Sequence, residues 1–402
     1  MRLNRFVYAV TGVVMLLFAG VVYAWSVISS PIAKEFVQWS STQLSLTFTL
    51  CMVFFCLGGF LSGLAAGKIK AKLKLYLSAL LFIIGFFIAS KAQSLAALYM
   101  GYGVLCGLAS GLVYNTVLSV ISQWFPDRQG FISGFLLMGF GLGSMMIGSI
   151  FTSVTPDTIG GWRGTFMVFG IVVAAVIFAG SFFIVKPSDK NIVKYKSQLS
   201  KTKPRKSSAD FTSIQMVKTP SFWMFFFWAT FLSAAGLALI SQATPFAKQL
   251  GPDVDMSVIA FVVGLISIFN GIGRVCFGYL FDKLGRKRTM QIITVMFILC
   301  CLMLSSSIVL SSFPMAVTGF ICTGFCYGGI TPTNSAFANS FFGSKHYPIN
   351  YSIINLNLII ASTGSTIAGS LYDASGSYLS TFLLMTVVSI AALIISLFIR
   401  ER

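Results

Sequence analysis

Charged residues are scarce in this chain. Only 9% of its 402 residues are charged, whereas a soluble domain carries about 25%. The sequence has a single histidine, and none of its eight cysteines belongs to a Cys-x-x-Cys pair. A soluble fold is therefore excluded, and neither a histidine cluster nor a nucleophile with a partner base is available for catalysis. We expect a membrane protein that is not an enzyme and that holds no metal and no cofactor.

Long hydrophobic runs take the place of charge, since 56% of the residues are hydrophobic. A membrane-spanning helix needs about 20 apolar residues, and twelve such stretches can be drawn, joined by short spacers except for one basic stretch. The predicted spans are 6–29, 43–66, 73–91, 95–121, 130–153, 163–185, 220–241, 256–280, 289–310, 314–338, 347–371 and 377–399. We therefore predict an all-α integral membrane fold of twelve transmembrane helices.

The net charge of +18 would suit a nucleic-acid partner, but its distribution points to membrane topology instead. If both termini are cytoplasmic, 23 of the 28 Lys and Arg residues fall in cytoplasmic segments and four in outside loops. This asymmetry follows the positive-inside rule. We expect a multi-pass protein of the cell (inner or plasma) membrane whose partners are the lipid bilayer and a small substrate, with no nucleic acid.

The sequence repeats itself at an offset of about 215 residues. Gly63-Leu-Ala-Ala-Gly-Lys68 matches Gly278-Tyr-Leu-Phe-Asp-Lys283, and Thr165-Phe166 matches Thr381-Phe382. Six spans in each copy predict two parallel six-helix repeats, with a binding site at the membrane midplane between them. The expected domains are an N-terminal half at 1–185, a basic cytoplasmic linker at 186–219 and a C-terminal half at 220–402.

Arg274 is the only charged side chain that we place inside a membrane span; the other Lys and Arg residues are assigned to the segments that flank the spans. A charge at bilayer depth costs at least ~2.5 kcal/mol and marks a functional site by default. All ten acids fall in predicted loops or at span ends, so we infer that a substrate anion is the partner. Arginine suits a carboxylate because its planar fork pairs with both oxygens. The alternative is a cation satisfied by backbone carbonyls or by reaching the membrane surface.

Asn270 lies four residues before Arg274 and therefore on the same helix face. It can orient the guanidinium or bind substrate, but it cannot carry a proton at ordinary pH. With no carboxylate inside the membrane, symport would need the proton on the substrate, on water or on a loop group. The residues leave exchange and proton symport open.

A loop sequence after the eighth span identifies a family. Gly278-Tyr-Leu-Phe-Asp282-Lys-Leu-Gly285-Arg286 resembles the motif of the major facilitator superfamily between spans 8 and 9. The resemblance implies a gating role in which Gly278 and Gly285 allow tight packing while Asp282 and Arg286 brace helix ends. The counterpart in the first half lacks the acid, because Gly67 stands there, and it lacks the second glycine.

Three further stretches resemble a narrower branch, the oxalate/formate antiporters and monocarboxylate porters. They are Gly20 to Ser26 in span 1, Trp124 to Gly130 after span 4, and Thr219 to Trp223 at the start of span 7. The resemblance implies that Arg274 holds the substrate carboxylate and that aromatic residues on spans 1, 4 and 10 enclose it. The corresponding residues here are Tyr23, Tyr114 and Tyr327. A monomer is also expected from the resemblance.

Three other polar or aromatic residues at membrane depth are candidates for the same site. They are Trp25, Asn115 and Asn355, for which packing or an interhelical hydrogen bond is the ordinary explanation. Oxalate carriers of the branch place a second cation, a lysine, in span 11, and the matching position here is Leu358. One cation suits one negative charge, which favours a monocarboxylate.

The function expected from these residues is secondary active transport of small organic monocarboxylates such as lactate, pyruvate, formate or acetate. Transport would proceed by alternating access, as exchange or as symport with a proton. The first alternative is oxalate/formate antiport, which Leu358 disfavours. An alternative of another class is a membrane anion sensor that binds through Arg274 but carries nothing across.

Overall fold

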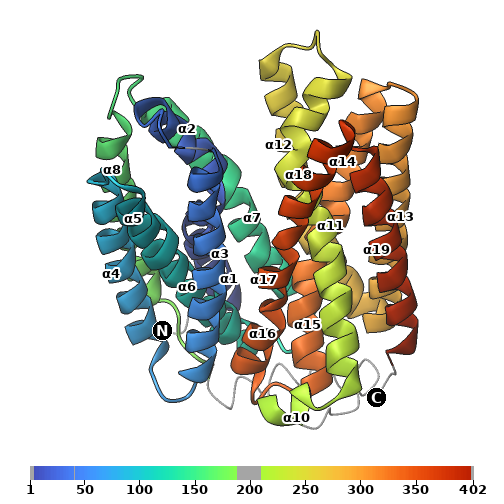
Figure 1. Ribbon diagram of the computed structural model, residues 1–402. Coiled ribbons are helices and arrows are strands. Elements are labelled where there is room, and N and C mark those ends of the chain that lie inside the picture. The colour runs from blue at the N-terminus through green and yellow to red at the C-terminus, as the bar shows by residue number, and fades with distance from the viewer. Residues whose placement is uncertain (1–3, 40, 188–209, 400–402) are drawn as a thin grey trace. The chain divides into compact units, whose positions relative to one another are not determined.

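The computed structural model describes residues 4–39, 41–187 and 210–399, and each regular element in these ranges is a helix (Figure 1). Twelve helical stretches within them are long and apolar enough to cross a membrane. The predicted all-α fold with twelve transmembrane helices is therefore confirmed. Most of the predicted linker, 188–209, lies outside the described residues.

The chain folds as two compact units. Unit 1 comprises Met1–Asp127, Leu136–Lys206 and Tyr347–Ser352, and unit 2 comprises Arg128–Phe135, Ser207–His346 and Ile353–Arg402. The first turns of the fifth span thus belong to unit 2, although the rest of that span belongs to unit 1. Conversely, the first turns of the eleventh span belong to unit 1, and the rest of it belongs to unit 2. The division into domains at 186–219 stays a prediction.

The helices of the first six spans form most of unit 1. They are α1 (Arg5–Ala19), η1 (Gly20–Ala24), α2 (Trp25–Glu35), α3 (Ser41–Leu64), α4 (Ala71–Ser90), α5 (Leu95–Leu98), η2 (Tyr99–Cys106), α6 (Gly107–Ile121), η3 (Ser122–Trp124), α7 (Gln129–Val154) and α8 (Trp162–Ser181).

The helices of the last six spans form most of unit 2. They are α10 (Ser213–Val217), α11 (Pro220–Leu250), α12 (Met256–Leu284), α13 (Arg286–Val309), α14 (Phe313–Gly328), α15 (Ile330–Phe342), α16 (Tyr347–Asn355), α17 (Asn357–Ala361), α18 (Thr363–Ser375) and α19 (Leu379–Phe398).

Helix starts follow from local capping. The α1 helix begins where the Asn4 side chain accepts a hydrogen bond from the Phe6 amide. The α11 helix begins with Thr219 as its cap and Pro220 in its first turn, where a missing N–H costs nothing. The short α10 helix has a complete capping box between Thr212 and Gln215.

The loops after α3 and α12 each contain one glycine in the left-handed region. Gly285 ends α12 with a φ of 81°, and Gly67 has the same φ of 81° in the first-half loop. Only glycine adopts this conformation without strain. The first-half loop lacks a glycine at the position of Gly285, as expected, because Lys70 stands there. Its left-handed residue is instead Gly67, which the alignment matches to Asp282.

Within the described residues, four of the twelve spans are interrupted along their length. Span 1 passes through the 3-10 segment η1, and span 4 contains the π-helical η2. Span 10 breaks between α14 and α15, and span 11 breaks between α16 and α17. Interrupted membrane helices are tolerated where the loosened backbone is buried in protein or lines a cavity, and in transporters they point to the binding site.

Candidate functional site

Arg274 and Asn270 form a hydrogen-bonded pair on α12. The Arg274 Nε donates to the Asn270 Oδ1 at 2.8 Å, and the side chains are only 8% and 6% exposed. The i to i+4 spacing brings them together on one face of the helix, as the sequence suggests. The bond holds the guanidinium group through its Nε. The opposite edge of the group carries the two terminal nitrogens, a geometry that can pair with both oxygens of a carboxylate. Because asparagine is neutral, the pair retains a charge of +1.

Helix α14 packs against the backbone of this pair. A Cβ added at Gly328 would contact the Asn270 carbonyl oxygen and lie 3.0 Å from the Arg274 amide nitrogen. In the same way, a Cβ at Gly273 would meet the Phe325 carbonyl oxygen. The two helices therefore touch through glycine at the level of the arginine, with no side chain between them.

Tyr327 directly precedes that contact, one residue from the break between α14 and α15. Its ring lies against Gly236 of α11, where even a Cβ would collide with it. Unit 2 thus brings the predicted residues Tyr327, Asn270 and Arg274 to one level of the α11, α12 and α14 cluster. The role of each in binding stays a prediction.

Sequence reasoning did not connect Gly134 of α7 with this site. A Cβ added at Gly134 would collide with the Arg274 carbonyl oxygen and would lie 2.8 Å from the carbonyl carbon. Four residues earlier, a Cβ added at Gly130 would likewise collide with the Gly278 carbonyl oxygen. Their spacing of one helical turn is the signal of a close helix contact, but a single sequence does not name the partner helix.

The remaining unit 2 candidate, Asn355, is the last residue of α16 and is 6% exposed. It lies at the interruption of span 11, where the next helix begins at Asn357. Leu358 follows on α17 and is 5% exposed. The apolar residue at the position of the family's second cation is therefore buried and not directed into water.

Tyr114 of α6 is a buried member of unit 1 whose hydroxyl is engaged. It lies 2.8 Å from the hydroxyl of Tyr351, and the two rings are stacked with centroids 6.2 Å apart. Phe55 and Phe140 meet the Tyr114 ring edge-on at 5.0 Å. Tyr351 was missed in the sequence, where nothing distinguishes it from the twelve other tyrosines.

Asn115, the neighbour of Tyr114, donates its side-chain amide to the Pro348 carbonyl oxygen at 3.0 Å. This bond ties α6 to the first turn of α16. A Cβ at Gly63 of α3 would lie 2.8 Å from the same oxygen. Asn115 therefore forms an interhelical hydrogen bond, which is the ordinary explanation for a polar residue in a span. The bond lies where α3, α6 and α16 meet.

Tyr23 and Trp25 lie on either side of the junction between η1 and α2. The Tyr23 ring is half-buried and meets Phe140 edge-on at 5.3 Å. The Trp25 indole is 4% exposed, packs on Tyr102 at 4.7 Å and donates to the Leu44 carbonyl oxygen at 3.0 Å. Trp25 therefore has the contacts of a packing residue. Tyr23 differs because it is only half-buried and lies in the 3-10 segment that interrupts span 1.

The predicted gating residues cluster at the end of α12. The Asp282 carboxylate accepts two backbone hydrogen bonds from the start of α7, from Gly130 N at 2.9 Å and from Phe131 N at 2.8 Å. A carboxylate is favourable there because the first N–H groups of a helix have no partner within it. Gly278 allows the close approach, since a Cβ on it would collide with the Gly130 carbonyl oxygen. Arg286 stacks over the Phe341 ring at 4.4 Å.

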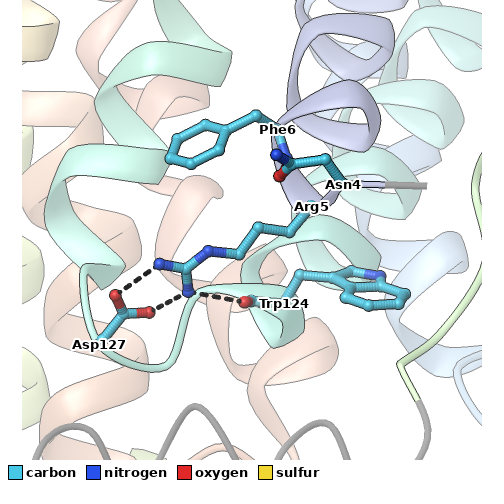
Figure 2. A network of polar contacts seen from close by, with 5 residues as sticks. All are labelled: Asn4, Arg5, Phe6, Trp124 and Asp127. Carbon is cyan, nitrogen blue, oxygen red and sulfur yellow. Dashed lines mark hydrogen bonds and ion pairs between the residues drawn. The ribbon is translucent and has the colours of Figure 1, made fainter. Parts of the chain in front are cut away.

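The Trp124 to Gly130 stretch anchors the start of the chain. Figure 2 shows the Arg5 guanidinium between Asp127 and the Trp124 carbonyl oxygen. It pairs with both carboxylate oxygens of Asp127, at 2.7 and 3.0 Å. The Trp124 indole stacks on Tyr8 and donates to the Val185 carbonyl oxygen at 2.8 Å. This part of the motif therefore joins the ends of three spans and is structural.

The burial of one lysine was not expected from the sequence. Lys74, which we counted among the residues that flank the spans, lies in the first turn of α4 and is 6% exposed. Its ammonium group donates to the Ser62 carbonyl oxygen at 3.1 Å and to the Ser62 hydroxyl at 3.2 Å. The Ser62 hydroxyl in turn lies 2.8 Å from that of Thr116. Hydropathy treats a lysine at a span end as solvated, whereas the tertiary packing around α4 buries this one beside Ser62 of α3.

Comparison with known proteins agrees with this architecture. A family model described as Major Facilitator Superfamily matches residues 10–360. The oxalate:formate antiporter of Oxalobacter formigenes is 26% identical, over 99% of this chain and 92% of its own length. Monocarboxylate transporter 12 of Mus musculus is 23% identical, over 90% of this chain and 78% of its own.

A solved structure shows the same fold. The proton:xylose symporter XylE, bound to 6-bromo-6-deoxy-D-glucose, has a TM-score of 0.74 at 14% identity, and the match covers 99% of this chain and 97% of the symporter. At this identity the likeness concerns the fold alone. Because the family model spans most of the twelve-helix chain, the protein is a member of the Major Facilitator Superfamily of transporters.

Proposed function

We propose that this transporter carries small organic monocarboxylates, with Arg274 as the residue that binds the carboxylate. The observation that supports this most is the buried Arg274–Asn270 pair, with its Nε to Oδ1 bond of 2.8 Å. A buried cation in a membrane span is expensive. The fixed guanidinium offers a planar, bidentate partner to an anion of matching charge.

The single charge of the pair favours a monocarboxylate over a dicarboxylate. Asn270 adds no charge, and the position at which the branch places a second cation is the buried Leu358. Oxalate would bring two negative charges to one guanidinium, and burying the uncompensated charge would be costly. The similarity to a monocarboxylate transporter supports this choice.

Oxalate/formate antiport is the second candidate, because the chain is also similar to an oxalate:formate antiporter over nearly its whole length. Formate is a substrate that both candidates share. The two proposals differ in whether oxalate binds, which Leu358 disfavours.

The transport cycle that follows from this proposal is alternating access. Carboxylate binding neutralises Arg274 and lowers the cost of enclosing it away from water. An empty carrier would have to enclose a bare guanidinium, so its return is slower. Exchange of one monocarboxylate for another should therefore be faster than net flux. Proton symport remains compatible with the proposal if the proton travels with the substrate.

Uptake of labelled L-lactate, formate, acetate and oxalate into proteoliposomes tests the substrate class. We expect the three monocarboxylates to enter in a saturable manner and oxalate to enter no faster than into protein-free vesicles. An inward proton gradient distinguishes symport, which it accelerates, from exchange, which it leaves unchanged. Oxalate uptake comparable to that of formate would contradict the monocarboxylate assignment and favour the antiporter. Binding of anions without any flux would favour a sensor.

A further inference from the structure

Two cysteines on neighbouring helices of unit 2 face each other. The Sγ atoms of Cys300 on α13 and Cys326 on α14 are 3.9 Å apart, and the side chains are 4% and 0% exposed. Both are free thiols. Helices α13 and α14 pack side by side (Figure 1), so the pair joins two spans that follow each other in the chain. The sequence does not reveal it, because the two residues are 26 positions apart.

A third thiol lies beside this pair. Cys322 is one helical turn before Cys326 on α14 and is near Cys300. Unlike the other two, it is partly exposed. Cys322 is therefore the thiol of this cluster that a reagent at the surface of α14 reaches first.

We propose that Cys300 and Cys326 form a dithiol site for a thiophilic centre, with trivalent organoarsenic oxides as the chemical class of ligand. Sulfur is a soft donor that prefers soft acceptors. One atom that bonds to two sulfurs fixes the distance between them. For example, two Zn–S bonds of about 2.3 Å at a tetrahedral angle place the two sulfurs about 3.8 Å apart. The observed separation of 3.9 Å therefore suits a single bridging atom.

The reaction balances without an oxidant. Each thiol forms one S–As bond, the bond between arsenic and its oxygen is lost, and the two thiol protons leave with that oxygen as water. Arsenic and sulfur keep their oxidation states. A bridged adduct is held by two bonds and therefore resists displacement by a monothiol, whereas a competing dithiol removes it.

The bridge would also affect the candidate carboxylate site. Cys326 is two residues before Gly328, which contacts the backbone of Asn270 and Arg274. Fixing α14 to α13 restrains the helix that packs directly on the arginine. We therefore expect the arsenical to inhibit transport; this consequence rests on the proposed function, whereas formation of the adduct does not.

The purified full-length protein in detergent can be treated with phenylarsine oxide and washed with 2-mercaptoethanol before its intact mass is measured. We expect the wild type to retain an adduct that 2,3-dimercaptopropanol removes. Cys300→Ser and Cys326→Ser should each retain one arsenical fewer than the wild type. Cys276→Ser, which removes an exposed thiol of α12, is the matched control and should retain as many as the wild type.

The proposal fails if both serine variants keep the wild-type adduct, or if 2-mercaptoethanol strips the wild type. Loss of the adduct in Cys322→Ser together with its retention in Cys326→Ser would also overturn it, because the pair would then be Cys300 and Cys322. Because the experiment measures the mass of the adduct, its result does not depend on whether the protein transports monocarboxylates. Retention of the adduct with unchanged transport would overturn only the link to the carboxylate site.

Discussion

Replacing Arg274 with glutamine is expected to lower kcat/KM for L-lactate by about 30-fold or more. Removing one partner of a buried, hydrogen-bonded charge pair costs about 2–5 kcal/mol, and each 1.4 kcal/mol is a factor of ten. Glutamine keeps much of the length of the side chain but has neither the charge nor the planar fork. The measurement is the initial rate of labelled uptake into proteoliposomes over a range of L-lactate concentrations.

Two matched variants make the Arg274→Gln result specific. Arg274→Lys keeps the charge but loses the bidentate geometry, so it should retain an intermediate activity. Lys248→Gln removes one positive charge from an exposed position near the end of α11 and should behave as the wild type. Equal uptake by Arg274→Gln and Lys248→Gln would contradict the assigned role of the arginine.

Replacing Gly134 with alanine is expected to reduce transport although Gly134 binds no substrate in our account. The added Cβ would collide with the carbonyl oxygen of Arg274, so the backbones of α7 and α12 would have to separate. Overpacking of a tight contact costs about 1–3 kcal/mol, which corresponds to a rate decrease of about 5- to 150-fold if the strain falls on the transport cycle. Transport per mole of folded carrier is the quantity to measure.

Gly264→Ala is the control for this substitution. Gly264 lies on α12, like Arg274, but no atom would lie within 4 Å of an added Cβ. The two variants therefore make the same chemical change in different surroundings. If Gly134→Ala transports as well as Gly264→Ala, then close contact between α7 and the Arg274 backbone is not needed for function.

The helices could be predicted from the sequence because their signals are local. Apolar runs long enough to cross a bilayer located all twelve spans. The spacing of four residues placed Asn270 beside Arg274, and the structure has the hydrogen bond between them. The left-handed conformation of Gly67 was not predicted, because a motif alignment compares residue types and not backbone conformations.

The contacts that depend on tertiary packing could not be predicted. Nothing in one sequence pairs Tyr114 with Tyr351, which is 237 residues away, or places Gly134 on the Arg274 backbone. Burial of Lys74 results from tertiary packing around the first turn of α4, and hydropathy alone treats a lysine at a span end as solvated. The local sequence pattern thus assigns each residue to a span, whereas the contacts between helices determine which residues it meets.

Exchange of L-lactate tests the central claim most directly. Proteoliposomes loaded with unlabelled L-lactate and matched empty vesicles would be given labelled L-lactate without a proton gradient. We predict saturable uptake that is faster into the loaded vesicles, because the carboxylate neutralises Arg274 during each passage. Uptake no greater than into protein-free vesicles, for L-lactate and for the other monocarboxylates, would contradict the assignment of this transporter as a monocarboxylate carrier.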